Sequence, residues 1–158
     1  MSEEKQFSVD QVRGAYGHRA EWLYFLCKSG LPEEKEDGPL HQAIRQCGHL
    51  HGRRKFGSTT SLQEFADVFR GSPAKEVFEM RTVHLDDELF EVEFHACPLV
   101  KAWKELGASD EEISKLCDIA MDGDRGIIEE LGGYDFELPE TIACGHDRCL
   151  IRISKSDR

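Results

Sequence analysis

The segment from Leu89 to Val100 most constrains how this chain can fold, because an alternating strand pattern in it passes directly into a helix pattern. In its first eight residues apolar and other side chains alternate with a period of two, so the two sets point to opposite faces of a strand. The apolar set is Phe90, Val92, Phe94 and Ala96, and the other set is Glu91, Glu93, His95 and Cys97. One face is therefore predicted to join the core, while the other carries ionisable groups.

Cys97 is placed at the junction between this strand and the helix that follows. Pro98 suits the first position of a helix, which puts Cys97 at or near the N-cap. Unpaired backbone N–H groups and the helix dipole favour a negative charge there. The sequence therefore predicts a partly accessible thiol with a pKa below the free-cysteine value of about 8.5.

Periodicity, capping residues and turn residues predict the other elements. Helices are expected over about 9–28, from Pro39, from Ser61 to before Gly71, over 99–106, after Ser109, and from about Asp124 to Leu131. Strands are expected over 75–85 and 88–96 around a turn at Asp86-Asp87, and over 136–144 and 148–154 around Gly145-His146-Asp147. The predicted fold class is α+β, with about four antiparallel strands in two hairpins that form one sheet packed against five or six helices.

The length of 158 residues fits a single domain, 1–158. Residues 1–72 are expected to form a helical N-terminal part, and residues 75–155 the hairpin–helices–hairpin part that carries the site. The net charge of −11 argues against a nucleic-acid partner. No run approaches the ~20 apolar residues that cross a bilayer and no export signal is apparent, so we expect a cytoplasmic protein with reduced thiols and no membrane partner.

Two groups of residues have a simple structural interpretation beside a functional one. Cys27 and Cys47 fall on apolar helical faces, where free cysteine usually packs as a small hydrophobe. The end of the second predicted helix is basic, and it either is a solvated helix end or holds a carboxylate ligand. Its basic residues are Arg45, His49, Arg53, Arg54 and Lys55.

The sharpest chemical hypothesis makes Cys97 a nucleophile. His95 lies two residues away on the same predicted strand face, and Asp118 in a later helix is expected to line the same pocket as an orienting group or proton donor. The competing interpretation makes Cys97 a buried junction thiol and His95 a surface residue. In that interpretation Asp118 is solvated and pairs at most with Lys115 or Arg125.

A metal centre is the second chemical hypothesis, although no metal or other cofactor is our first expectation. One strand offers two potential metal ligands and a tight turn offers three more, and together these side chains would suit Zn²⁺. These residues are His95, Cys97, Cys144, His146 and Cys149. An equally good interpretation of Cys144 and Cys149 is that they bind no metal and pack against each other as cross-strand neighbours at the base of a hairpin. Walker, Rossmann, G-x-S-x-G and H-E-x-x-H patterns are absent from the sequence, which argues against nucleotide-dependent chemistry, serine hydrolysis and zincin proteolysis.

The C-terminal half resembles the L-2-amino-thiazoline-4-carboxylic acid hydrolase family. The resemblance covers about residues 75–155 and rests on Cys97-Pro98-Leu99-Val100, Leu106-Gly107, Leu116-Cys117-Asp118, Asp122, Glu140-Thr141-Ile142-Ala143-x-Gly145 and Arg148-Cys149-Leu150-Ile151-Arg152. The closing Gly-x-x-x-Cys hairpin is also similar, more faintly, to vinyl-reductase-type small-ligand domains. That pattern usually has an acidic residue where this sequence has His146.

The resemblance implies hydrolysis of a cyclic amidine-type C–N bond in a small heterocyclic amino acid, with a ring-opened carbamoyl product. Cys97, Asp118 and His95 are the expected catalytic residues. The expected substrate-binding residues are Glu93, Cys117, Asp122, Thr141 and Cys149. The partner is then a small-molecule substrate, and a homo-oligomer is compatible with the sequence. The alternative is a ligand- or metal-binding sensor module that shares the fold and carries out no chemistry.

Overall fold

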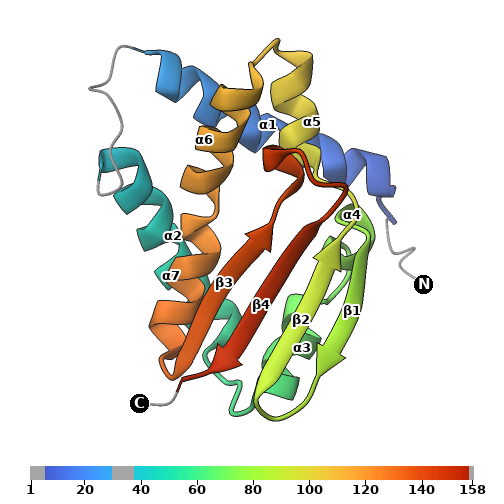
Figure 1. Ribbon diagram of the computed structural model, residues 1–158, viewed down its shortest axis with the longest axis vertical. Coiled ribbons are helices and arrows are strands. Elements are labelled where there is room, and N and C mark those ends of the chain that lie inside the picture. The colour runs from blue at the N-terminus through green and yellow to red at the C-terminus, as the bar shows by residue number, and fades with distance from the viewer. Residues whose placement is uncertain (1–5, 30–37, 157–158) are drawn as a thin grey trace, which may run out of the picture.

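The computed structural model describes residues 6–29 and 38–156, which form the predicted α+β fold (Figure 1). Six of its α-helices have eight residues or more, and four strands make one antiparallel sheet. The elements in chain order are α1 (Val9–Lys28), α2 (Pro39–Phe56), α3 (Leu62–Phe69), α4 (Ala74–Val77), β1 (Met80–Leu85), β2 (Leu89–Phe94), α5 (Pro98–Glu105), α6 (Asp110–Ala120), α7 (Asp122–Leu131), β3 (Tyr134–Glu140), the 3₁₀ helix η1 (Ile142–Cys144) and β4 (Cys149–Lys155).

The sheet has the strand order β1-β2-β4-β3, so both predicted hairpins contribute to one sheet, as expected. The turn of the first hairpin lies at Asp86, whose Oδ1 accepts hydrogen bonds from the backbone N–H groups of Glu88 at 2.8 Å and Leu89 at 2.9 Å. In the centre of the sheet Phe94 of β2 is the register partner of Cys149 of β4. This pairing places the end of β2 beside the start of β4.

Two predicted strands are shorter than expected. Residues 74–77 form α4 rather than the start of β1, since Ala74, Lys75 and Glu76 have a higher helix propensity than strand propensity. Residues 142–144 form η1, in which the Thr141 hydroxyl accepts a hydrogen bond from Cys144 N at 3.0 Å. The connection between β3 and β4 therefore spans residues 141–148 and is not the tight turn that the sequence predicted.

The predicted helix starts are confirmed at three serines. Ser8 and Ser109 form complete capping boxes with Gln11 and Glu112, and the Ser61 side chain accepts a hydrogen bond from Glu64 N. Cys97 is the N-cap of α5, as Pro98 indicated. The last helix begins at Asp122, two residues before the predicted start.

The helices divide into two groups around the sheet (Figure 1). Those of the first group, α1, α5 and α6, gather at one end of the sheet, and their cluster of buried side chains includes Ala20, Leu23, Leu99, Trp103, Ile113 and Leu116. The second group consists of α2, α3 and α7, and α2 and α7 run together beside β3. The side chains of this group form a second buried cluster with those of the sheet, which includes Phe56, Phe65, Phe90, Val92, Ile128 and Ile151. The core thus consists of two hydrophobic clusters.

Glycines let α2 and α7 approach each other very closely. A Cβ atom at Gly48 of α2 would overlap the carbonyl oxygen of Gly123, and one at Gly126 of α7 would overlap the carbonyl oxygen of Arg45. Backbone therefore packs directly on backbone where the two helices cross. This contact fixes the position of the first turn of α7.

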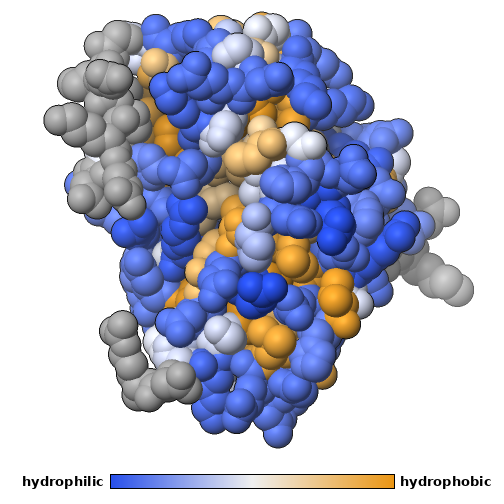
Figure 2. Space-filling model, in the orientation of Figure 1, coloured by the Kyte–Doolittle hydropathy of each residue, from blue (hydrophilic) through white to orange (hydrophobic). Residues whose placement is uncertain are grey.

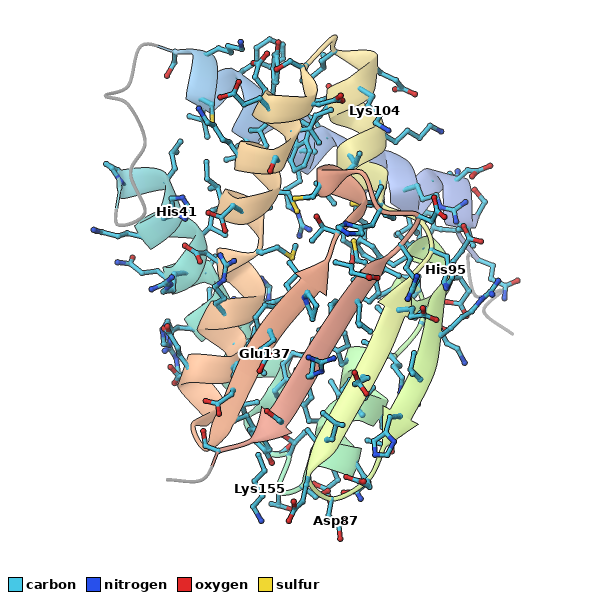
Figure 3. The ribbon with its side chains drawn as sticks, viewed as in Figure 1. His41, Asp87, His95, Lys104, Glu137 and Lys155 are labelled. Carbon is cyan, nitrogen blue, oxygen red and sulfur yellow. The ribbon has the colours of Figure 1, made fainter. Side chains whose placement is uncertain are left out.

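The outer face of the sheet is charged, as the alternation in β2 predicted. Phe90, Val92 and Phe94 are buried, whereas Arg152 of β4 bridges Glu91 at 3.0 Å and Glu137 at 3.2 Å on the other face. Figure 2 shows this side of the molecule as mainly hydrophilic with hydrophobic patches between, and Figure 3 labels Glu137 on it. Among the described residues, none of the helices has the length and apolar character needed to cross a membrane.

Candidate functional site

A cavity of about 330 Å³ lies at the seam between the two hydrophobic clusters. Both clusters contribute to its wall, which is lined mainly by apolar side chains. These include Leu23, Phe56, Phe78, Met80, Phe94, Leu99, Val100, Trp103, Ile127 and Ile151. A concave, mostly apolar space with a few polar groups is the usual form of a small-molecule site, so we take this cavity as the candidate site.

Cys97 lines the cavity from the N-cap of α5. Burial raises the pKa of its thiol, and this effect exceeds the opposing influence of the Val100 and Leu99 N–H groups and of the Arg19 charge. The prediction of an easily ionised thiol is therefore wrong for the ligand-free protein. The helix N-terminus is present as expected, but the apolar surroundings of the sulfur outweigh it.

Three of the predicted substrate-binding residues line the cavity together with Cys97. These are Cys117 of α6, Thr141 before η1 and Cys149 of β4. Burial raises the pKa of Cys149 to about 11 and also raises that of Cys117. The Sγ atom of Cys149 accepts a hydrogen bond from Ile142 N at 3.3 Å. Burial thus raises the pKa of three of the four thiols that line this cavity, and the fourth is that of Cys47.

Glu93 and His95 lie on the outer side of the sheet and do not line the cavity. His95 Nε2 is 3.5 Å from Glu93 Oε1, and Glu93 also pairs with Arg148. The strand ends at Phe94, and the His95 and Ala96 N–H groups donate to the Phe78 carbonyl, so the alternation does not extend to the next residues. The predicted partnership of His95 with Cys97 is therefore wrong, and Figure 3 shows His95 near the end of β2.

The two predicted acidic residues of α6 and α7 also lie outside the cavity lining. Asp118 is exposed and pairs with Arg125 at 2.9 Å, which is the competing placement that the sequence analysis allowed. Asp122 is fully buried, and its carboxylate contacts His41 at 2.8 Å, Arg45 at 3.0 Å and Arg125 at 2.7 Å. The pocket role predicted for Asp118 is therefore wrong, and Asp122 holds α2 and α7 together.

Asp124 is the cavity's carboxylate, and the sequence analysis missed it. It lines the cavity from the first turn of α7, and among the described residues its side chain has no hydrogen bond or ion pair. Burial raises its pKa to about 6, against the opposing charges of Arg19 and Arg125. The sequence did carry a signal, since Asp124 precedes Ile127, Ile128 and Leu131 by three, four and seven residues and so shares their apolar stripe.

The residues of the hypothetical zinc site are not assembled. Within residues 6–29 and 38–156, no three His, Cys, Asp or Glu side chains converge to hold a metal ion. Cys144 is exposed beside the Ser114 hydroxyl at 3.4 Å, and His146 Nδ1 lies 3.2 Å from the Thr141 carbonyl oxygen. Cys27 and Cys47 are exposed rather than packed in the core, so that prediction is also wrong.

The chain is similar to known proteins in both sequence and fold. Residues 23–153 match the family model described as L-2-amino-thiazoline-4-carboxylic acid hydrolase. No match was found among curated proteins. The solved structure of a trafficking protein particle complex subunit 3 from Naegleria fowleri, covalently bound to palmitic acid, is similar with a TM-score of 0.60. The likeness covers 90% of this chain and 96% of that one at 14% identity, so it shows a shared fold.

Proposed function

Because this chain belongs to the L-2-amino-thiazoline-4-carboxylic acid hydrolase family, we propose that it opens a cyclic amidine-type ring by hydrolysis, with Cys97 as the nucleophile. The observation that carries the proposal is the composition of the cavity. A thiol, Cys97, and a carboxylate without a hydrogen-bond partner among the described residues, Asp124, line one space whose remaining wall is mostly apolar. A small-molecule substrate bound there contacts both groups and little bulk water.

Asp124 is the group that recognises the amidine. An amidinium ion presents two parallel N–H donors, which match the two oxygens of a carboxylate in the same way as a guanidinium group does. With a pKa of about 6, the Asp124 carboxyl is mostly ionised at neutral pH and still accepts a proton readily. The amidinium ion relieves the cost of a buried negative charge.

The same positive charge activates Cys97. In the ligand-free protein burial raises the pKa of this thiol. An amidinium ion in the cavity lowers that pKa, because an opposite charge nearby favours the thiolate. The N–H groups of Leu99 and Val100 at the start of α5 act in the same direction. The nucleophile is therefore formed when the substrate is present.

The proposed reaction proceeds in two steps and consumes one water molecule. The Cys97 thiol gives its proton to Asp124, its Sγ atom bonds to the amidine carbon, and the C=N electron pair moves to nitrogen. The ring C–N bond then breaks as the lone pair of the exocyclic nitrogen re-forms a C=N bond to the same carbon, and the departing ring nitrogen takes the proton from Asp124. In the second step water attacks this carbon, gives one proton to Asp124 and expels the Cys97 thiolate, which takes that proton and becomes the thiol again. The remaining hydroxyl proton passes to the released amine as the C=O bond of the ring-opened carbamoyl compound forms.

The assay is ring opening of L-2-aminothiazoline-4-carboxylate by the full chain and three variants. We expect Cys97→Ser to abolish turnover and Asp124→Asn to lower kcat by about 10²–10⁴, the usual value of a proton-transfer group. Asp118→Asn is the matched control, because it removes a carboxylate from the surface and not from the cavity. Full activity of Asp124→Asn together with loss of activity in Asp118→Asn would contradict the assignment.

A second candidate function is supported by the mainly apolar lining of the cavity. In this function the protein holds an apolar ligand and performs no turnover, and Cys97 carries an acyl chain as a thioester. The similar trafficking-complex subunit is covalently bound to palmitic acid. Intact mass of the purified protein distinguishes the two candidates, since an acyl increment on Cys97 that neutral hydroxylamine removes would favour the second.

A further inference from the structure

The mouth of the cavity lies between α1 and α2. Four residues of its lining are exposed, and they are Arg19 of α1 and Cys47, His51 and Lys55 of α2. All other lining residues are buried or half-buried. Three of these four side chains are basic or can become so, and the entrance is therefore a cationic rim in a chain whose net charge is −11.

Some basic residues of α2 form ion pairs with α7, and others line the cavity. Arg45, His49 and Arg53 face α7, where they pair with Asp122, Glu129 and Glu130 at 2.8–3.7 Å. His51 and Lys55 line the cavity, and within the described part of the chain neither forms an ion pair. One side of α2 therefore forms ion pairs with α7, and the side chains of His51 and Lys55 remain at the entrance of the cavity.

Arg19 faces the rim from the opposite helix. Its guanidinium carbon lies 4.8 Å from the centroid of the Tyr16 ring, which also lines the cavity. Within residues 6–29 and 38–156 it has no carboxylate at ion-pair distance, although its charge acts on both Asp124 and Cys97. A planar guanidinium with free N–H groups is the side chain best suited to bind a carboxylate through two hydrogen bonds.

The interior is larger than a single small ring requires. A cavity of ~150 Å³ lined by apolar side chains accepts benzene, and the cavity here has about 330 Å³. Its lining contains Phe78, Phe94 and Trp103, which offer aromatic surface and few polar atoms. A ligand that fills this space therefore has an apolar body of about two rings, or one ring with a substantial side chain.

We propose that the rim formed by Arg19, His51 and Lys55 is a carboxylate-binding subsite, and that the ligand is an amphipathic carboxylate whose apolar body is larger than a five-membered ring. The inference rests on the proposed function and narrows its substrate class. The carboxylate remains at the entrance between α1 and α2. The apolar body reaches inward past Cys97 and Asp124 to the aromatic wall.

Titration calorimetry with three probes tests this inference on the full chain. The probes are benzoate, 2-naphthoate and 2-naphthamide, none of which contains an amidine. We expect 2-naphthoate to bind at least about 10-fold more tightly than benzoate, because it buries a second ring. We also expect it to bind at least about 10-fold more tightly than 2-naphthamide, because the amide has no charge to pair with the rim.

The variants locate the subsite. The double variant Arg19→Gln/Lys55→Gln should lose the preference for 2-naphthoate over 2-naphthamide while still binding the amide. Arg54→Gln removes a positive charge from the same helix at an exposed residue outside the lining, so it should keep the preference. Because Arg19, Lys55 and Arg54 are all exposed, unchanged thermal unfolding will show that each variant is folded.

Each remaining outcome overturns a stated part of the inference. Equal affinity for 2-naphthoate and 2-naphthamide would contradict the carboxylate subsite. A preference for 2-naphthoate that survives in Arg19→Gln/Lys55→Gln would contradict it as well. Equal affinity for benzoate and 2-naphthoate would contradict the proposal that the apolar body of the ligand is larger than a five-membered ring. Absence of binding by all three probes would contradict both this proposal and the carboxylate subsite. Since none of the probes contains an amidine ring, their binding is measured separately from turnover, and binding without ring opening in the turnover assay would reject the proposed function and retain the subsite.

Discussion

The Nδ1 atom of His41 lies 2.8 Å from Oδ2 of Asp122, and this contact joins the first turn of α2 to the first turn of α7. Arg45 and Arg125 occupy the other carboxylate oxygen at 3.0 and 2.7 Å. Burial alone raises the pKa of Asp122, but the hydrogen bonds from Arg125, Arg45 and His41 outweigh burial and lower it. The buried charge is thus fully partnered.

Replacing Asp122 should therefore weaken the fold strongly. We expect Asp122→Asn to lower the free energy of unfolding by about 3–5 kcal/mol, because two guanidinium groups lose a buried counter-charge. Asp118→Asn is the matched control, since Asp118 pairs with the same Arg125 at the surface and should cost less than ~1 kcal/mol. Urea unfolding at pH 7 measures both variants, and equal losses would contradict the structural role of Asp122.

The pH dependence of stability should report on Asp124. Its folded-state pKa of about 6 lies above the unfolded value of ~3.9, so the folded protein binds more protons between these pH values and stability falls as pH rises through them. Asp124→Asn should therefore be more stable than the wild type at pH 8, by about 1–3 kcal/mol. Below pH 4 the two curves should converge. A wild-type melting temperature that rises relative to the variant between pH 4 and 7 would show that the carboxylate has a partner.

Alkylation rates should rank the cysteines by environment. Cys144 is exposed, and hydrogen bonds with Ser114 and Thr141 lower the pKa of its thiol, whereas burial raises that of Cys97. At pH 7.5 iodoacetamide should modify Cys144 at least about 10-fold faster than Cys97 in the ligand-free protein. Peptide mass spectrometry over time gives both rates, and a Cys97 that reacts as fast as Cys144 would mean that the cavity thiol is ionised without a ligand.

Two glycine-to-alanine changes should have opposite signs. Gly48→Ala forces a methyl group onto the carbonyl oxygen of Gly123 and should cost about 1–3 kcal/mol or more. At Gly14 of α1 a Cβ atom meets nothing within 4 Å, so Gly14→Ala should stabilise the protein by about 0.5–1 kcal/mol through helix propensity. Thermal unfolding compares them. A neutral Gly48→Ala would show that α2 and α7 can separate without penalty.

Local sequence signals predicted the elements of this fold well. The capping boxes at Ser8 and Ser109, the turn at Asp86 and the Cys97-Pro98 junction each depend on residues within four positions of one another. Such signals act before distant parts of the chain meet. They also fixed which face of β2 is buried, because alternation along a strand is itself a local property.

The site was predicted less well, because it depends on contacts between distant segments. Asp118 and Asp124 are both acidic residues in neighbouring helices, and only the packing of α7 against α2 and the sheet decides which one faces the cavity. The apolar stripe of α7 passes through Asp124, while Asp118 lies beside the stripe of α6 and not on it. Likewise, the alternation that placed His95 beside Cys97 stops where β2 ends.

The seam between the two hydrophobic clusters has a consequence for the cooperativity of unfolding. The cavity reduces the contact area between the α1–α5–α6 cluster and the cluster formed with the sheet. An occupant restores that contact and requires both clusters to be folded at once, so it couples their unfolding. At a ligand concentration 100 times its Kd this linkage adds about 2.7 kcal/mol to the free energy of unfolding. The melting curve should then become steeper as well as shift upward, which makes the shape of the transition a reporter of occupancy.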